Sequence, residues 1–426
     1  MILRILLFAL CCFNLCVPCN AAERLFAIRD GKKWGFINRT GKIVIAPRFH
    51  EVGSRSEGLW SIKSGKKWGF VAESSGQVAI APRFEAVGVW SEGLCGVIAG
   101  GKVGFIGKNG KFQIAPRFVA TLDNISVGFV ESHFSGGLAP AQISENEAQK
   151  RGYKGTYGFI NRMGNWKITP RFSVAEPMSD GMARVTIIEA DFIYSGYVSQ
   201  IGKFVPLPKG ASDMFNETFY EGLAAVPVLR DAKTGRRLYG FIDKTGKWAI
   251  PPRFLEVLYG GDILEMRTGF KDDLATVMLG DKPQNVRVGW IGRDGKWAIS
   301  PRFNGGGAGF TEGLAPAREG EKPGEGKGGF IDKSGKFVIA PQFEKMGIFS
   351  DGLAPTQRKG EEWGYIDATG AQIIAPRFSY VSMNDAITPD MAALQFRDGL
   401  AWVQEGNVRG YIGKNGDWVW KESPRL

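Results

Sequence analysis

A short glycine-centred motif recurs along almost the whole chain and constrains the fold more than any other feature of the sequence. In its fullest form the motif is Trp, Gly, an aromatic residue and a β-branched residue, and the tryptophan is present at Trp34, Trp68 and Trp363. The motif glycines are Gly35, Gly69, Gly104, Gly158, Gly240, Gly289, Gly329, Gly364 and Gly410. A tenth, degenerate copy surrounds Gly196, near residues 190–210. Recurrence of this kind predicts an array of about ten small structural units.

A second motif, Pro-Arg-Phe or its variant Pro341-Gln342-Phe343, follows eight of these glycines at a nearly constant distance. The separation from the glycine to the proline is 12 residues in seven copies and 13 in the copy from Gly69 to Pro82. The arginines of this motif are Arg48, Arg83, Arg117, Arg171, Arg253, Arg302 and Arg377. Because this block tolerates almost no change in length, we expect it to be rigid, whereas the more variable intervals between blocks contain loops.

The residues within each block favour β-structure. The run Gly-Phe-Ile is followed by a turn such as Asp332–Lys336, whose glycine suits a left-handed conformation, and then by an apolar run such as Trp248–Ile250. The proline that follows has no N–H group, so it is expected at the end or at the edge of a sheet. The segment Gly352–Thr356 resembles a further strand. Each unit is therefore predicted to be an antiparallel β-meander with an aromatic-rich face, too small to fold alone.

These residues resemble the WG (KWG) repeat family. The shared elements are Trp-Gly-Phe/Tyr-Ile-Asp, Thr-Gly-Lys, Ile-x-Pro-Arg-Phe and Ser-Glu-Gly-Leu-Ala, and they cover roughly residues 25–420. Val103, Val288, Gly328 and Arg409 replace the tryptophan in individual units. The resemblance implies an array of β-strand repeats of the kind found mostly in bacterial proteins, without a common enzymatic activity.

Two arrangements of such an array remain open. Ten units exceed the four to eight blades of ordinary propellers, and the periods are irregular. We therefore expect an all-β, open twisted or superhelical array, with a propeller-like closed ring as the alternative.

The N-terminus has the features of a secretory signal peptide. A short segment with one positive charge precedes the apolar run Ile5–Val17, and small residues allow cleavage after Ala21 or Ala22. The alternative is an N-terminal membrane anchor. We expect residues 1–21 to be the signal peptide and 22–426 the repeat domain, without a transmembrane span. The protein is then exported to the periplasm, the cell surface or the medium.

Removal of residues 1–21 would leave few chemically reactive side chains. Cys95 is the single cysteine after residue 21, and it occupies a position where other units have alanine, which predicts a small buried side chain. His50 occupies a variable position, which predicts a surface or turn residue. His133 lies in an insertion with Asp123, Asn124, Glu131 and Ser132, so a Ser/His/Asp arrangement is conceivable, but the nucleophile-elbow sequence is absent. We expect no catalytic residue, cofactor or metal.

The arginines of Pro-Arg-Phe have two interpretations. In the structural one, each arginine pairs with the acidic residue of a Glu-Gly-Leu motif and joins one unit or neighbouring units. Those acidic residues are Glu57, Glu92, Asp180, Glu221, Glu312, Asp351 and Asp398. In the functional one, the arginines form a basic stripe for an acidic polymer. We favour the structural interpretation because acid and arginine recur together.

Composition and loop lengths point to a binding role. The chain has a formal net charge of +11, and residues 1–21 contribute only Arg4, so an anionic partner is plausible. The insertions at 119–135, 255–272 and 379–397 would lie on one side if the array turned once in about three units. We expect a non-catalytic exported scaffold that binds a protein or a cell-envelope polymer. The alternative is a hydrolase with its site in these loops. Nucleic acid is not an expected partner.

Overall fold

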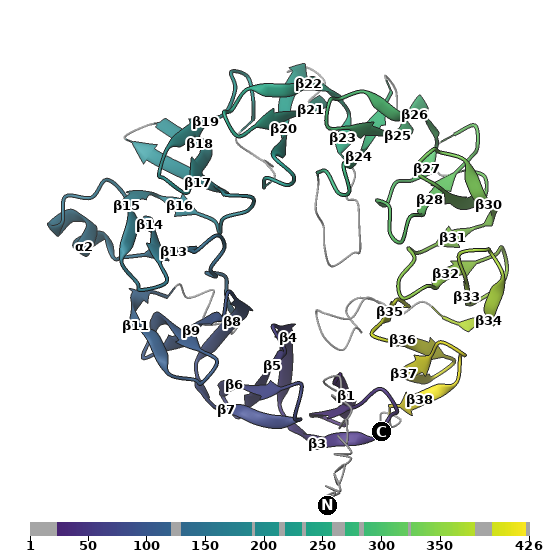
Figure 1. Ribbon diagram of the computed structural model, residues 1–426, viewed down its shortest axis with the longest axis horizontal. Coiled ribbons are helices and arrows are strands. Elements are labelled where there is room, and N and C mark those ends of the chain that lie inside the picture. The colour runs from purple at the N-terminus through teal and green to yellow at the C-terminus, as the bar shows by residue number, and fades with distance from the viewer. Residues whose placement is uncertain are drawn as a thin grey trace, which may run out of the picture.

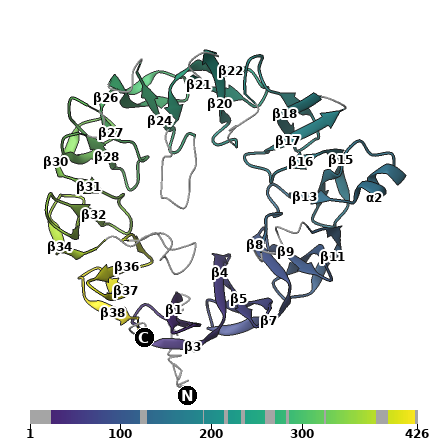
Figure 2. The same cartoon turned by 180° about the vertical axis from the view of Figure 1, so that it is seen from behind.

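The computed structural model of the chain is a closed ring of ten small antiparallel sheets (Figure 1). It describes residues 24–120, 129–189, 192–212, 218–231, 236–257, 269–280, 285–322, 325–379 and 394–422. The same ring is seen from behind in Figure 2. The predicted all-β array of about ten units is confirmed. Of the two arrangements considered, the structure has the closed ring, a ten-bladed propeller, rather than the favoured open array.

The strands follow one another from the centre of the ring to its edge within each blade, as Figure 1 shows. Blades 1 to 3 consist of β1 (Phe26–Asp30), β2 (Lys33–Ile37) and β3 (Ile43–Phe49); β4 (Glu51–Ser56), β5 (Leu59–Ser64), β6 (Lys67–Ala72) and β7 (Gln77–Phe84); and β8 (Ala86–Ser91), β9 (Leu94–Ala99), β10 (Lys102–Gly107) and β11 (Phe112–Val119). Blades 4 and 5 consist of β13 (Leu138–Gln142), β14 (Tyr157–Asn161) and β15 (Trp166–Phe172), with the short helix α2 (Glu145–Lys150) between β13 and β14; and β16 (Val174–Ala175), β17 (Met182–Glu189), β18 (Phe192–Ser199) and β19 (Phe204–Pro206).

The second half of the ring repeats this plan. Blades 6 to 8 consist of β20 (Leu223–Asp231), β21 (Arg236–Asp243) and β22 (Trp248–Phe254); β23 (Glu256–Val257), β24 (Leu274–Leu279), β25 (Arg287–Gly292) and β26 (Trp297–Phe303); and β27 (Gly305–Gly306), β28 (Ala315–Arg318), β29 (Gly328–Ile331) and β30 (Phe337–Phe343). Blades 9 and 10 consist of β31 (Lys345–Met346), β32 (Ala354–Gln357), β33 (Trp363–Ile366) and β34 (Gln372–Phe378); and β35 (Phe396–Arg397), β36 (Leu400–Glu405), β37 (Val408–Gly413) and β38 (Trp418–Lys421).

One strand joins a sheet outside this order. β12 (Phe129–Val130) precedes blade 4 in the sequence but pairs in parallel with β8, as a fifth strand of blade 3. The sheet of blade 4 consequently begins at β13.

The repeated glycine allows two strands to approach each other closely. β2 and β3 pair with a register shift, Trp34 opposite Phe49 but Phe36 opposite Ile45, so the Ala-Pro-Arg segment bulges over Gly35. A Cβ atom on Gly35 would lie 2.4 Å from the carbonyl oxygen of Ile45, which is impossible without a shift of the backbone. Gly364 faces the same obstacle at 2.7 Å. The fixed spacing between the two motifs therefore has a steric cause.

The core lies between the blades. The Gly-Phe-Ile strand is buried on both faces: Phe36 packs against blade 2 with Trp60 and Ile62, and Ile37 packs against blade 10 with Trp402. The aromatic residue after the motif glycine usually meets an aromatic residue of the next blade edge-on, as in Phe330 with Phe349, whose ring centroids are 4.9 Å apart. Each blade thus covers the apolar face of its neighbour, which explains why a single unit does not suffice for folding.

The ring closes where blade 10 meets blade 1, near the two ends of the described chain (Figure 1). Phe26, Ile28 and Ile37 of blade 1 form one buried cluster with Leu400, Trp402 and Tyr411 of blade 10. No described strand is shared between these two blades. Whether the array closes depends on the rotation from each blade to the next. The number of residues between motifs does not determine this rotation.

Candidate functional site

Six of the Pro-Arg-Phe arginines connect their blade to the one that follows it. An Nη2 group of the arginine donates a hydrogen bond to the carbonyl oxygen of the glycine in the third turn of the next blade, the turn between its last two strands. The pairs are Arg83 with Gly110, Arg117 with Gly164, Arg171 with Gly202, Arg253 with Gly295, Arg302 with Gly335 and Arg377 with Gly416. The same guanidinium lies over the phenylalanine of its own motif, 4.9 Å from the ring centroid for Arg302 and Phe303.

Two copies depart from this arrangement in ways that fit their sequences. Arg48 lies over Phe49, with 5.2 Å to the ring centroid, and the next blade is the one with the extra residue in its third turn. Where Gln342 replaces the arginine, Arg358 from β32's C-terminal end donates to Gln342 Oε1 at 3.0 Å. The guanidinium of Arg358 also lies over Phe343, 5.4 Å from its centroid.

The acidic residues of the first turn, between the first two strands of a full blade, do not pair with these arginines. Their carboxylates accept a hydrogen bond from a backbone N–H in the first turn of the next blade, as for Glu312 with Gly352 N at 3.0 Å and Asp351 with Gly399 N at 2.7 Å. The other pairs are Glu57 with Gly93, Glu92 with Gly137, Asp180 with Gly222 and Glu221 with Asp273. The predicted arginine–acid pair is therefore wrong. The arginine lies on the outermost strand and the acid at an inner turn, so each contacts the next blade separately.

The first and third turns of every blade lie on the same side of the ring because successive strands are antiparallel. Contacts between the two kinds of turn support this: Lys108 of a third turn lies 3.1 Å from Glu57 of a first turn, and Lys244 lies 2.7 Å from Asp180. We call this side the turn face. The second turns, such as the one between β17 and β18, lie on the opposite face.

The third turns carry most of the exposed cations of the turn face. The exposed basic residues are Arg39, Lys42, Lys108, Lys111, Arg162, Lys203, Lys244, Lys247, Arg293, Lys296, Lys333, Lys336 and Lys414. The acidic residues of the same turns are Glu73, Asp243, Asp294, Asp332, Asp367 and Asp417. Several of these aspartates cap the turn itself, as Asp367 does by accepting hydrogen bonds from the hydroxyl and N–H of Thr369 and the N–H of Ala371. The hydroxyl of Thr369 lowers the pKa of Asp367 below its ordinary value.

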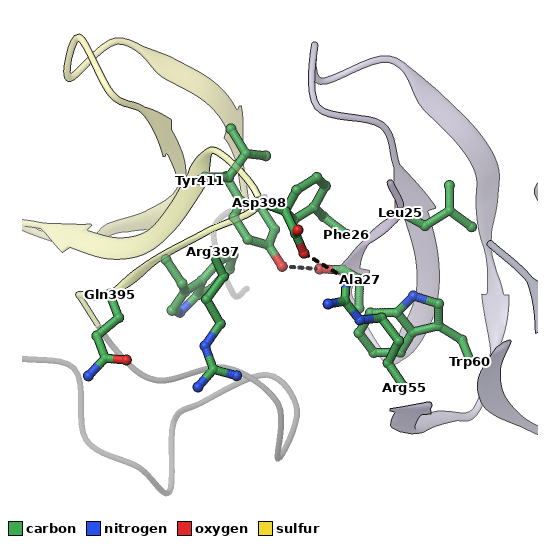
Figure 3. Close-up of a pocket in the computed structure, with 11 residues that line it drawn as sticks. Leu25, Phe26, Ala27, Arg55, Trp60, Gln395, Arg397, Asp398 and Tyr411 are labelled. Atoms are coloured by element: carbon green, nitrogen blue, oxygen red, sulfur yellow. Dashed lines mark hydrogen bonds and ion pairs between the residues drawn. The ribbon is translucent and has the colours of Figure 1, made fainter. Parts of the chain in front are cut away.

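A cluster of charged side chains fills the junction of blades 10 and 1 (Figure 3). Asp398 is the first-turn acid of blade 10, but the described part of blade 1 has no first turn to receive it. Instead, Arg55 Nη1 lies 2.9 Å from Asp398 and 3.2 Å from the buried Glu73. Arg24 lies 3.5 Å from Asp398 and 3.3 Å from Glu73. These ion pairs join blades 10, 1 and 2.

The same junction contains a cavity of about 200 Å³, lined by Arg55, Trp60, Arg397, Trp402 and Tyr411 among others. Tyr411 donates a hydrogen bond from its hydroxyl to the carbonyl of Ala27, which crosses the junction at 2.9 Å. Burial, followed by the nearby charge of Arg55, lowers the pKa of Arg397. The cavity is smaller than the several hundred cubic ångströms of ordinary small-molecule sites. The cavity is a gap in the interface between blades 10, 1 and 2.

The cysteine, histidines and serine considered as reactive groups are buried or bonded to backbone atoms. Cys95 is fully buried, as predicted, and burial raises the pKa of its thiol. His50 is exposed and accepts a hydrogen bond from Gly65 N on the ring nitrogen Nδ1. The Nδ1 atom of His133 lies 3.0 Å from the backbone oxygen of Glu131, and Ser132 donates its hydroxyl to the carbonyl of Pro140. Asp123 and Asn124 lie outside the described residues.

Other predictions concern segments that the structure covers only in part. Ala21 and Ala22 precede the first described residue, and the insertions at 119–135, 255–272 and 379–397 are described only at their ends. The hypothesis that these loops stack because the array turns once in three units does not fit a ring of ten blades. Across the described ranges, no helix has the length and apolar character of a membrane span, and no three metal-ligating side chains form a cluster.

Comparison with solved structures finds matches of very low sequence identity. The crystal structure of a eukaryotic initiation factor has a TM-score of 0.48 and 11% identity, with 83% of this chain and 96% of that chain covered. The computationally designed Ika8 protein has a TM-score of 0.37 and 11% identity, with 81% and 99% covered. BamB from Moraxella catarrhalis has a TM-score of 0.31 and 8% identity, with 86% and 94% covered. No curated protein matches the chain significantly.

The family model for the WG containing repeat matches the chain seven times. The matched segments are 34–68, 68–102, 157–187, 239–258, 289–322, 329–361 and 363–385. They coincide with the Trp-Gly strand, the third turn and the Pro-Arg-Phe strand described above. The chain belongs to the family of WG-containing repeat proteins.

Proposed function

We propose that this protein is a non-catalytic exported scaffold whose ring binds an anionic protein or polymer of the cell envelope. The observation that carries the proposal is the set of exposed lysine and arginine side chains on the third turns of the turn face. They outnumber the acidic residues of these turns, and the first-turn carboxylates are engaged by backbone N–H groups of the next blade. A rigid ring holds these cations in a fixed arrangement, which favours a large, repeating anionic partner over a small molecule.

The test is retention of residues 22–426 on cell-envelope material at increasing salt concentration. Binding through exposed charges weakens as ionic strength rises, because the screening length shortens. The variant Lys333→Glu with Lys336→Glu reverses two charges on the turn face and should weaken retention. The matched control, Lys32→Glu with Lys66→Glu, makes the same change in second turns on the opposite face, where both lysines are also exposed. Equal loss in the two variants would contradict a role for the turn face.

The competing proposal is a hydrolase with its site in the inserted loops. It requires His133 or Asp123 to take part in turnover, although Ser132 and His133 bond to different backbone carbonyls. An activity in the purified protein that disappears in His133→Ala, with retention on envelope material unchanged, would favour the enzyme over the scaffold.

A further inference from the structure

The two most exposed large apolar side chains of the described residues occupy the same position in neighbouring blades. Met163 is 73% exposed and Ile201 is 87% exposed. Each directly precedes the glycine of its third turn, in blades 4 and 5. The two turns are adjacent because Arg171 of blade 4 donates to the carbonyl of Gly202 in blade 5.

The other blades show that this position does not require an apolar residue. The equivalent residues are Thr40, Ser75, Asn109, Thr245, Asp294, Ser334, Thr369 and Asn415. In several blades the polar side chain stabilises the turn, as when the hydroxyl of Thr369 donates to Asp367. Met163 and Ile201 have no such role and project from the turn face. A single exposed apolar residue is ordinary, but two on adjacent turns rimmed by polar residues are typical of a site of interaction.

The charges around these two side chains are positive. The third turns of blades 3 to 5, residues 107–111, 161–165 and 199–203, contain Lys108, Lys111, Arg162 and Lys203 and no acidic residue. The third turns of blades 6 to 10 each contain an aspartate, which blades 3 to 5 lack. We call the third turns of blades 3 to 5 the docking sector. The nearest first-turn acids are engaged, Glu57 by Gly93 N and Lys108, Glu92 by Gly137 N, and Asp180 by Gly222 N and Lys244. Lys111, Arg162 and Lys203 are in no ion pair with a described residue.

We propose that the docking sector binds the surface of a lipid bilayer with anionic headgroups. The lysine and arginine side chains contact the headgroups, and Met163 and Ile201 enter the boundary between headgroups and acyl chains. A soluble acidic polymer would engage the charges but give no reason for apolar tips. This inference rests on the proposed envelope-binding function and specifies one partner for it.

A second apolar patch provides a matched control. Phe192 and Ile193, at the end of the β17–β18 hairpin of blade 5, are 64% and 61% exposed. They lie at a second turn, so they belong to the opposite face, and the neighbouring Glu189 is exposed and acidic. This hairpin has the apolar area but neither the position nor the charge that the proposal requires.

The first experiment measures binding of residues 22–426 to vesicles of phosphatidylcholine alone or mixed with phosphatidylglycerol. The apolar residues 1–21 are omitted because they would bind lipid themselves. Met163→Thr with Ile201→Thr introduces the residue that other blades use, so the turns are retained. We expect this variant to bind the mixed vesicles about tenfold or more weakly. Arg162→Gln should weaken binding about fivefold. Phe192→Thr with Ile193→Thr should leave binding unchanged.

The second experiment locates the contact. Cys95 is fully buried and is the single cysteine of residues 22–426, so a cysteine introduced as Met163→Cys can be labelled selectively with an environment-sensitive fluorophore. Its emission should shift to the blue on mixed vesicles, whereas the same label at Ile193→Cys should not respond.

The outcomes separate this inference from the proposed function. Unchanged binding in the Thr variant, or equal loss in the Phe192 and Ile193 control, would overturn the docking sector. Absence of vesicle binding with intact retention on envelope material would overturn the lipid partner and leave the scaffold function standing. Absence of both would overturn the proposed function as well.

Discussion

Replacing one Pro-Arg-Phe arginine tests whether the contact with the next blade contributes to the stability of the ring. Arg302 makes two interactions: its guanidinium lies over Phe303, and Nη2 donates to the carbonyl of Gly335 in blade 8. Arg48 makes the ring contact with Phe49 at a similar distance, 5.2 Å, but within the described ranges it makes no hydrogen bond to the next blade. Comparing Arg302→Ala with Arg48→Ala therefore isolates the hydrogen bond between blades.

The expected magnitudes follow from these contacts. The cation–π contact contributes about 0.5–1 kcal/mol at a partly exposed site, so Arg48→Ala should cost about 1 kcal/mol or less. A hydrogen bond from a charged donor adds about 1.5–3 kcal/mol, reduced somewhat by the partial exposure of Arg302, so Arg302→Ala should cost about 2–3 kcal/mol. The difference between the two variants is about 1–2 kcal/mol.

Urea denaturation gives the free energies, provided that different probes show coincident transitions. Hydrogen exchange adds a local measurement. In Arg302→Ala the amide of Gly335 should exchange faster, whereas Arg48→Ala should leave the third turn of blade 2 unchanged. If the two variants lose equal stability, the arginine acts only within its own blade and the reasoning is refuted.

The remaining predictions concern the closing joint, the turns and the repeated glycine. Asp398→Asn removes one charge that Arg55 bridges, so the thermal midpoint should fall and the N-terminal blades should become more sensitive to protease. An unchanged midpoint would show that the apolar cluster alone closes the ring. The Ser334 hydroxyl is the main cause of the low pKa of Asp332, so this carboxylate stabilises the fold above its unfolded pKa of about 4, and the contribution is lost as the pH falls through the lower folded pKa. Asp332→Asn should therefore lower stability at pH 7 and lessen its decline in acid, as measured by thermal unfolding across pH. Gly364→Ala should cost more than about 2 kcal/mol, because its Cβ would lie 2.7 Å from a backbone oxygen, and a smaller loss would mean that the bulge can relax.

Much of the structure of a blade could be predicted from the sequence, because the interactions that form it are between residues close in the chain. The positions of Gly364 and the Pro-Arg-Phe motif reflect the close approach of two adjacent strands, and the turn glycines reflect backbone conformations within a few residues. Comparison between units also identified Cys95 as a buried side chain. In each case, the equivalent positions in the other units show which types of residue the position accepts.

The contacts between blades could not be predicted in the same way. Arg302 and Glu312 recur together in the sequence, which suggested a mutual pair, yet their partners are backbone groups that carry no signature in the sequence. The choice between an open array and a ring depends on the angle between blades, to which every interface contributes. The position shared by Met163 and Ile201 does have a signal in the sequence, because an alignment of the third turns places two apolar residues where the other units are polar.

The absence of a described strand shared between blades 1 and 10 has a consequence for how the ring can change. Most of the described blades are contiguous stretches of sequence, and the closing joint is made by side-chain contacts between the first and last blades. A circular permutant could therefore begin at almost any blade boundary, with the original termini joined by a linker. Each sheet would then remain intact. Such an architecture tolerates the gain, loss or reordering of whole units in the gene. The residues at the interface between the first and last blades would then have to change to keep the ring closed.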